Sequence, residues 1–306
     1  MRPLDTLPQA TVLLILEKIA PGSRLQSVEL LAGSFSNHTH RVEARLPDGK
    51  PLKLVVRRYQ EYGDYDRGEK ARREFKAFEL IHQHGIPGPE ALMLDDTGEI
   101  LGVPGIVTRL VPGALRLEAP AESLPWARKL ALMLAKIHAI PLDEADRSFL
   151  LDANREATWF LGGESAPKFM QKFPGGAGLW QVLHERYDSL QLVTPALVHI
   201  DYWVGNVLWD AKEISAVLDW EEAACGDPVI DVAYARMNMC LMGLPEAADE
   251  FLRTYESESG HKAKNLGFWE MAAVARPMDA PQAWEMEQEP RAGRFQQFLE
   301  EALRRS

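Results

Sequence analysis

The sequence predicts an α+β protein in which an antiparallel sheet with a packed helix comes first and a larger, mainly helical part follows. Residues 27–59 contain three short apolar stretches typical of strands, and Asp48-Gly49 supplies a hairpin turn between the last two. Helical spacing of apolar residues dominates after Pro112-Gly113. A chain of 306 residues is also long enough for about two compact units.

The N-terminal part begins with a helix that is expected to end at Pro21-Gly22, and a small polar loop joins its first two strands. That loop can bring backbone amides close to an anion, although such loops are more often simple turns. The boundary between the two domains is expected at about 109–113. The elements before it are a helix over 8–19, strands over 27–31, 38–46 and 52–59, a helix over 66–84 and a strand over 105–110.

Glu74 lies inside the apolar stripe of the helix over 66–84, three residues after Ala71 and four before Phe78. A buried carboxylate is costly without a cation, so a basic partner on the neighbouring sheet is implied. Arg57 and Arg58 at the end of the third strand are the candidates. Alternation does not choose between them because both faces of that strand carry apolar residues. The alternative is an exposed Glu74 at the margin of the stripe.

The C-terminal part contains several amphipathic segments typical of helices. His138 lies beside the apolar stripe of the first, where we interpret it as a core or capping residue without a catalytic role. The predicted helices cover 126–140, 180–190, 231–242, 246–255, 267–276 and 291–305.

Two short apolar strands interrupt these helices, one leading into Asp201 and the other into Asp219, with Asn206 between them. Adjacent strands would bring these three oxygen-bearing side chains together. Carboxylate and amide oxygens suit Mg²⁺, and phosphoryl transfer needs such ligands together with a base near the attacking hydroxyl. The run from His199 to Asn206 also has the spacing of the protein-kinase catalytic loop, His-x-Asp, four residues, then Asn.

The chain resembles the aminoglycoside phosphotransferase and choline kinase family of small-molecule kinases over nearly its whole length. The family's motifs stand here in the family's order, and together they are far more specific than any one alone. They read Val198-His199-Ile200-Asp201, Gly205-Asn206-Val207-Leu208, Val217-Leu218-Asp219-Trp220-Glu221 and Gly226-Asp227-Pro228-Val229-Ile230-Asp231.

This resemblance implies a bilobal protein-kinase-like fold with a nucleotide-binding lobe over 1–109 and a catalytic, substrate-binding lobe over 110–306. It implies that Asp201 is the catalytic aspartate and that Asn206 and Asp219 bind Mg²⁺, with His199 and Asp231 as structural support. It places Arg57, and not Arg58, at the position of the family's β3 lysine, with Glu74 as its partner. The residues it assigns to ATP binding are Gly33, Ser34, Ser36, Asn37, Arg57, Glu74, Arg109 and Val111.

Two positions depart from the family pattern. Ile200 replaces a glycine, and because a β-branched residue is strained at positive φ, we expect an extended conformation there. Arg57 replaces the usual lysine; it keeps the charge but is bulkier and forked. These departures leave a second hypothesis open, a catalytically weak nucleotide-binding pseudokinase or regulatory protein. A metal-dependent hydrolase is a third, although the chain has neither His-Glu-x-x-His nor Gly-x-Ser-x-Gly.

The expected partners are ATP and a small hydroxylated acceptor, with Mg²⁺ as cofactor. A net charge of −11 disfavours nucleic acid and anionic lipid, and no apolar run is long enough to predict a membrane span. Only two cysteines occur, which fits a reducing cytoplasm.

The identity of the acceptor stays open at this level. Acidic residues such as Glu221, Asp227 and Asp249 favour a cationic acceptor such as an aminoglycoside or choline, although such residues are more often solvated surface. The tryptophans 203, 269 and 284 are candidates for lining an apolar or quaternary-ammonium pocket, or for simple core packing. Similar folds also serve macrolides, hydroxyacyl-CoA species and homoserine, and the fold does not choose among them.

Overall fold

The computed structural model describes residues 4–31, 37–60, 66–116, 122–286 and 288–305, and the chain divides into two compact units. The first comprises Met1–Gly113 together with Ser215–Glu222, and the second comprises Ala114–Ile214 and Ala223–Ser306. The segment that carries Asp219 is thus grouped with the N-terminal unit, and the lobes over 1–109 and 110–306 stay a prediction. The hinge at 109–113 stays a prediction.

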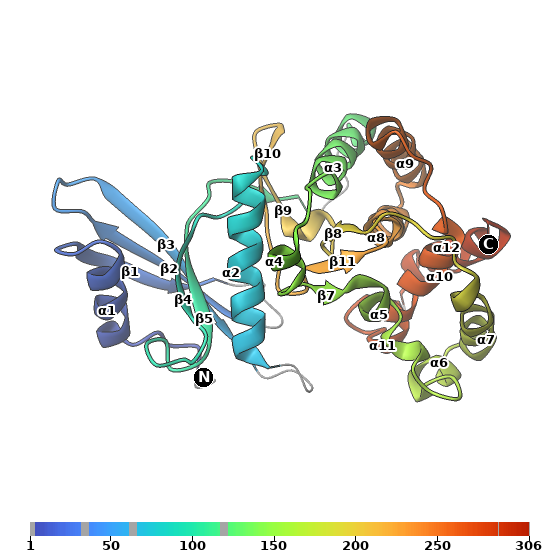
Figure 1. Ribbon diagram of the computed structural model, residues 1–306, viewed down its shortest axis with the longest axis horizontal. Helices are drawn as coiled ribbons and strands as arrows, with labels where there is room; N and C mark the ends of the chain where they lie inside the picture. Colours follow the sequence, from blue (N-terminus) through green and yellow to red (C-terminus); the bar gives the residue numbers. More distant parts are fainter. Residues whose placement is uncertain (1–3, 32–36, 61–65, 117–121, 287, 306) are drawn as a thin grey trace. The chain divides into compact units, whose positions relative to one another are not determined.

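The first unit is built on a five-stranded antiparallel sheet with strand order β1-β2-β3-β5-β4. Helix α1 lies on one face of this sheet and α2 on the other (Figure 1). The predicted hairpin turn is confirmed at Gly49, where φ is +85°. The elements of the unit are α1 (Gln9–Ile19), β1 (Arg24–Leu30), β2 (Asn37–Arg45), β3 (Pro51–Tyr59), α2 (Arg67–Gln83), β4 (Ala91–Asp95) and β5 (Gly105–Arg109).

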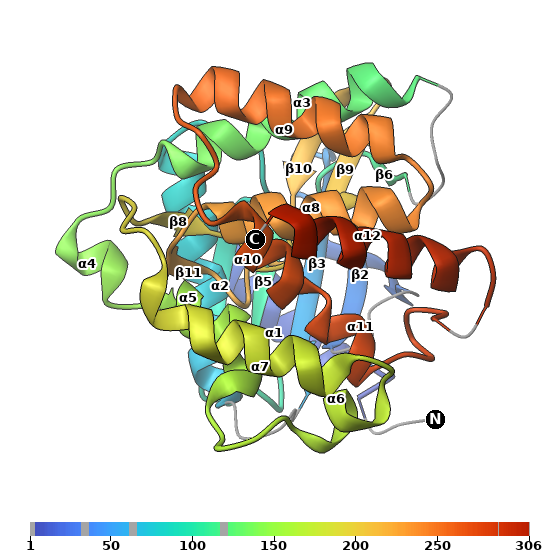
Figure 2. The same ribbon diagram turned by 90° about the vertical axis from the view of Figure 1, so that its right-hand side faces the viewer.

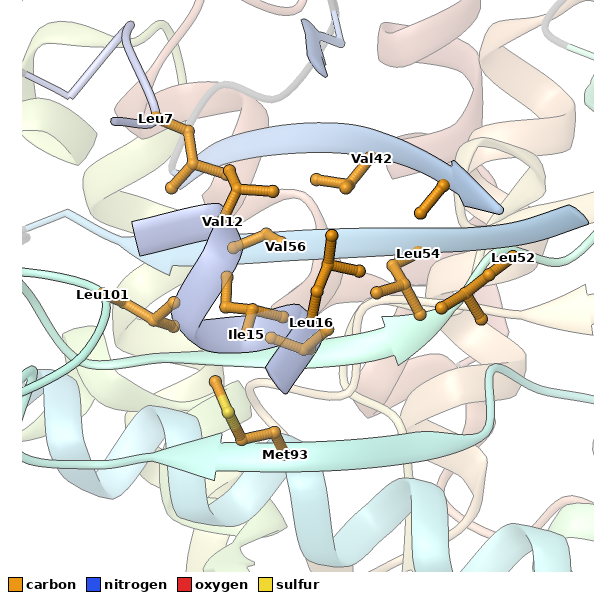
Figure 3. Close-up of a cluster of buried hydrophobic side chains, with 12 residues drawn as sticks. Leu7, Val12, Ile15, Leu16, Val42, Leu52, Leu54, Val56, Met93 and Leu101 are labelled. Carbon is orange, nitrogen blue, oxygen red and sulfur yellow. The ribbon is translucent and has the colours of Figure 1, made fainter. Parts of the chain in front are cut away.

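The core of this unit lies between α1 and the sheet, where alternate residues of β3 meet the apolar face of α1 (Figure 3). Leu52, Leu54 and Val56 point into this core, and full burial of such a side chain contributes roughly 1.5–3 kcal/mol. Because successive side chains of a strand alternate, Arg57 projects from the opposite face, towards α2. The position of α1 therefore decides which face of β3 each arginine occupies, a choice that the sequence pattern left open.

Strand β4 was not predicted from the sequence, since Ala91–Asp95 is a short run without clear alternation. It is followed by a loop that the buried carboxylate of Asp95 holds in place. This carboxylate accepts hydrogen bonds from the backbone amides of Gly98, Ile100 and Leu101, at 3.0, 2.9 and 2.7 Å.

The second unit is mainly helical. Helix α8 lies at its centre, with nearly every residue buried, and packs against α9, α10 and α12. Helices α3 and α9 run side by side (Figure 2). The helices of this unit are α3 (Ser123–His138), α4 (Glu144–Arg147), α5 (Ala153–Ala157), η1 (Trp159–Leu161), α6 (Lys168–Lys172), α7 (Gly176–Arg186), η2 (Tyr187–Ser189), η3 (Val204–Asn206), α8 (Val229–Leu241), α9 (Pro245–Ser259), α10 (Leu266–Ala273), α11 (Ala275–Asp279) and α12 (Arg291–Arg305).

The predicted helix over 267–276 is wrong in one respect, because it is divided between α10 and α11. Two small sheets complete the description, with strand orders β10-β9-β6 and β7-β11-β8. The two strands that were expected to lead into Asp201 and Asp219 correspond to β8 and β10, and the other four strands were not predicted. The strands are β6 (Ala114–Leu115), β7 (Leu151–Asp152), β8 (Ala196–Val198), β9 (Val207–Asp210), β10 (Glu213–Val217) and β11 (Ala224–Gly226).

None of the helices within the described ranges has the length and apolar character needed to cross a membrane.

Candidate active site

The segment that precedes Asp201 is held by the buried carboxylate of Asp231, at the start of α8. Its two oxygens accept hydrogen bonds from the backbone amides of His199 and Ile200, at 2.7 and 2.8 Å. Both residues follow directly on β8, so α8 fixes the end of this strand. The bracing contact that the family resemblance implied for Asp231 is therefore present.

Ile200 adopts a left-handed conformation with φ of +72°, so the expectation of an extended backbone there is wrong. This conformation is costly for a β-branched residue and persists only where surrounding contacts enforce it. The hydrogen bond from its amide to Asp231 and the burial of its side chain supply that enforcement. The chain thus keeps the backbone geometry that a glycine would adopt freely.

Asp201 follows this strained residue, and the side chains that hold its carboxylate include those of Asn206 and Arg276. The Asn206 amide nitrogen donates to its Oδ2 at 2.8 Å and to its backbone carbonyl at 2.9 Å. The Arg276 guanidinium donates to its Oδ1 at 3.2 Å. The structure therefore brings Asp201 and Asn206 together, as the spacing predicted.

The loop between Asp201 and Asn206 is anchored on both sides. The Tyr202 hydroxyl donates to the backbone carbonyl of Leu130 on α3, at 2.9 Å. Gly205 lies against the indole of Trp203, and a Cβ atom at this position would come within 2.2 Å of the ring. Trp203, a candidate for the acceptor pocket, thus packs on the loop itself.

Arg57 is the centre of a second group of charges, in the first unit. Its guanidinium donates to Glu74 at 3.0 Å, to Glu221 at 3.0 Å and to Asp219. The predicted pairing of Glu74 with Arg57 is confirmed, whereas Arg58 donates instead to the backbone carbonyls of Leu4 and Thr6. Although burial by itself lowers the pKa of Arg57, the three carboxylates raise it well above its ordinary value.

Glu74 is fully buried, and that burial raises its pKa to about 7 against the lowering effect of Arg57. The hydroxyl of Tyr59 donates to its second oxygen. Glu74, in the middle of α2, therefore accepts from Arg57 with one carboxylate oxygen and from Tyr59 with the other.

Asp219 and Glu221 present two further carboxylates to this group. Asp219 has φ of +64°, a rare conformation for a residue other than glycine and one that clusters at functional sites. Glu221 accepts from the Asn37 amide at 2.6 Å and from Lys70 at 3.4 Å, and its backbone carbonyl accepts from Arg73 at 2.7 Å. Glu221, Lys70 and Arg73 were not among the predicted site residues.

The structure says less about the remaining residues that were predicted to bind the nucleotide. Gly33, Ser34 and Ser36 lie outside the described residues. Arg109 ends β5 with an exposed side chain that pairs with Glu90 at 2.6 Å, and Val111 follows it at the end of the first unit. Their contact with a nucleotide stays a prediction.

The sequence analysis gave no role in the site to two side chains, His138 and Arg276. His138 was interpreted as a core residue, yet its Nε2 lies 3.1 Å from Asp231 Oδ2 and its Nδ1 lies 2.7 Å from the Tyr255 hydroxyl. Its position beside the apolar stripe of α3 was the available signal. No sequence signal pointed to Arg276, because 75 residues separate it from Asp201.

A pocket in the second unit is lined by Arg276, which holds this carboxylate. The space between its lining residues is about 350 Å³ when the open solvent at its mouth is counted, and the enclosed part is far smaller. Its lining residues are Ala157, Trp159, Ile200, Ile230, Tyr234, Trp269, Ala272, Ala273 and Arg276. Ile200 precedes Asp201 in the chain and Arg276 donates to it, so the pocket ends beside the candidate base.

Across the described ranges, no group of three or more His, Cys, Asp or Glu side chains is arranged to hold a metal ion. Asn206 and Asp219 offer one amide and one carboxylate oxygen. Oxygens of both kinds suit Mg²⁺, and the joint binding of this ion by the two residues stays a prediction.

Two features define the class of protein as a protein-kinase-like phosphotransferase. The antiparallel sheet carries on its third strand an arginine held by carboxylates, and the helical unit that follows contains a braced His-x-Asp loop. The model of the "Phosphotransferase enzyme family" matches residues 27–266. The chain belongs to this family.

Curated relatives match only in part. Acyl-CoA dehydrogenase family member 10 of Mus musculus is 28% identical over 176 residues, which are 53% of this chain and 16% of that protein. Viomycin phosphotransferase of Streptomyces vinaceus is 31% identical over 139 residues, 42% of this chain and 48% of that protein. The matched region thus spans less than half the length of either relative.

Among solved structures, a thermostable mutant of the aminoglycoside phosphotransferase APH(4)-Ia, in a ternary complex with AMP-PNP and hygromycin B, has the same fold. Its TM-score is 0.63 at 16% identity, over 95% of this chain and 98% of that one. At this identity the likeness establishes the fold alone.

Proposed function

We propose that this protein transfers the γ-phosphate of ATP to a hydroxyl group of a small molecule, in a Mg²⁺-dependent reaction with Asp201 as the base. The observation that supports this best is the fixed Asp201 carboxylate, held by Asn206 and Arg276 at the end of a pocket. The nucleotide in the APH(4)-Ia complex, AMP-PNP, supports ATP as the donor.

In this reaction the acceptor oxygen bonds to the γ-phosphorus while the bond from that phosphorus to the β,γ-bridging oxygen breaks. The acceptor proton passes to Asp201, or is oriented by it, and ADP leaves. Asn206 holds Asp201 Oδ2 in place, which keeps the base in one orientation.

Mg²⁺, when bound, would neutralise charge on the triphosphate, and Asn206 and Asp219 are the residues that would hold it. The Asn206 amide nitrogen already donates to Asp201, so its amide oxygen is the atom that serves a cation. Arg57 is held by Glu74 and would bind phosphate oxygens with its planar fork.

The proposal is tested by Asp201→Asn, with acceptor-dependent ADP release and ATP binding measured side by side. Loss of general-base assistance should lower kcat by about 10²–10⁴ while ATP affinity changes little. Asp188→Asn, an exposed change of the same kind in η2, is the matched control. Unaltered turnover in Asp201→Asn would refute the role of this residue.

One observation favours a second function, a nucleotide-binding protein without efficient transfer. Arg57 donates to Asp219, so the proposed cation ligand is already engaged by a fixed positive charge. This alternative predicts tight ATP binding with no ADP release in the presence of any alcohol. Product analysis by mass spectrometry separates the two functions.

A further inference from the structure

The chemistry of the pocket beside Asp201 indicates which acceptor it takes, provided that the proposed function holds. Most of its lining residues have apolar or aromatic side chains. Two alanines from α10, Ala272 and Ala273, line the pocket together with the rings of Trp159, Tyr234 and Trp269. A wall of this kind favours a ligand with an apolar or flat body.

Trp159 supplies an independent observation. It is 47% exposed although it lines the pocket, and it is one of few large apolar side chains in the described residues with such exposure. Its ring is held by stacking on Phe169 at 5.2 Å and by an edge contact with Phe160 at 5.9 Å. A rigid, exposed indole at a pocket is a platform for apolar contact.

The charge of the wall is equally informative. Among the lining residues that the structure describes, Arg276 alone is charged, and none is a carboxylate. Its guanidinium lies 4.9 Å from the centre of the Tyr234 ring. The face of the ring that would attract a ligand cation therefore already holds one.

The acidic residues that favoured a cationic acceptor in the sequence are engaged elsewhere. Asp227 accepts from the Trp269 indole at 2.7 Å and from Asn265 at 3.0 Å. Asp249 pairs with Arg236 at 3.2 Å, and Glu221 belongs to the group around Arg57. An amino sugar would thus bring positive charge against Arg276, and the carboxylate beside it, Asp201, is already paired with that guanidinium at 3.2 Å.

We infer that the acceptor is an alcohol with an apolar body that is neutral or negatively charged, and that Arg276 selects against cationic acceptors. The apolar body contacts Trp159 and Trp269, and the hydroxyl lies at Asp201. Aminoglycosides and choline-like alcohols are the classes that this pocket rejects.

The test compares medium-chain alcohols of equal length whose far end carries a methyl, a carboxamide, a carboxylate or an ammonium group, together with choline and an aminoglycoside. ADP release with Mg²⁺-ATP gives kcat/KM for each, and mass spectrometry detects the phosphate ester. We expect the uncharged and anionic alcohols to exceed the cationic ones at least tenfold. Trp159→Ala should raise KM for the apolar alcohols with little change in kcat.

Variants of Arg276 test the selecting residue. Arg276→Glu should reverse the order of acceptors, and Arg276→Gln, which keeps a donor but loses the charge, should narrow the difference between anionic and cationic ones. Arg304→Glu makes the same charge change on an exposed part of α12 and should leave the order intact. A preference that neither Arg276 variant alters would overturn its role.

The outcomes also separate this inference from the function on which it rests. Turnover of choline or the aminoglycoside above that of the apolar alcohols would overturn the acceptor class and leave phosphotransfer standing. ATP binding without ADP release for every alcohol would overturn both.

Discussion

The brace on the Asp201 segment gives the sharpest test of the structure, through the substitution Asp231→Asn. The carboxylate of Asp231 is fully buried, accepts two backbone amides at 2.7 and 2.8 Å, and lies 3.1 Å from His138 Nε2. Asparagine keeps one acceptor oxygen and replaces the other with a donor. The two backbone amides bond to different oxygens, so one of them must then lose its partner, while the shape of the side chain stays nearly the same.

The expected cost follows from these contacts. A hydrogen bond to a charged group contributes about 1.5–3 kcal/mol, and a buried donor left unsatisfied costs about 1–3 kcal/mol. We therefore expect Asp231→Asn to lower the free energy of unfolding of the second unit by about 3 kcal/mol. Relaxation of Ile200, whose φ of +72° is strained, offsets part of this cost, and it favours displacement of the segment once the brace is lost.

Two assays measure the effect of this substitution, one on the stability of the whole fold and one on the braced segment alone. Urea unfolding monitored by tryptophan fluorescence measures the loss of stability, with Asp188→Asn as the matched control at an exposed position. Hydrogen exchange at the amides of His199 and Ile200 measures the brace itself, and we expect protection there to fall first. Catalysis should fall about 10²-fold as well, since small displacements of a catalytic group have effects of this size.

The reasoning would be refuted by an Asp231→Asn variant that unfolds at the wild-type urea concentration and keeps slow exchange at both amides. That result would mean that β8 and its neighbours hold the segment without the carboxylate.

The other predictions concern the charge groups. Glu74→Gln should flatten the pH dependence of stability: the folded pKa of about 7 exceeds the ordinary 4.5, so wild-type stability falls as pH rises between these values, by at most about 3 kcal/mol. Urea unfolding midpoints of both proteins at pH 5 and pH 8, without added metal, check this. An equal change of midpoint with pH in the wild type and in Glu74→Gln would contradict it. Asp219→Ala should weaken ATP binding only when Mg²⁺ is present, as calorimetric titrations with and without the ion would show. Arg236→Ala should lower the free energy of unfolding by about 3 kcal/mol, because it leaves the buried carboxylate of Glu270 with Arg305 alone. Arg305→Ala should lower it by less. Equal midpoints of the two variants in thermal melts would be evidence against this.

Much of the site was predictable because its parts are local in the chain. The spacing from Asp201 to Asn206 places both on one loop, and the structure joins them at 2.8 Å. Glu74 stood out because a carboxylate inside an apolar stripe requires a cation. Helical period and a single Asp-Gly turn were enough for most of the larger elements.

Other features depend on contacts between distant segments. The choice of Arg57 over Arg58 required the position of α1, which decides the face to which each residue of β3 points. The left-handed backbone of Ile200 is imposed by Asp231, 31 residues further along the chain. His138 and Arg276 join the site only because α3 and α11 carry them to Asp231 and Asp201.

The sequence by itself determined the class of protein and the chemistry of its loops, because motif spacing and residue type act over a few positions. Only the tertiary structure decided the character of the pocket, since a count of acidic residues does not reveal which of them are already paired. Charge in a folded protein acts over a few ångströms, and folding alone sets which groups lie within that distance.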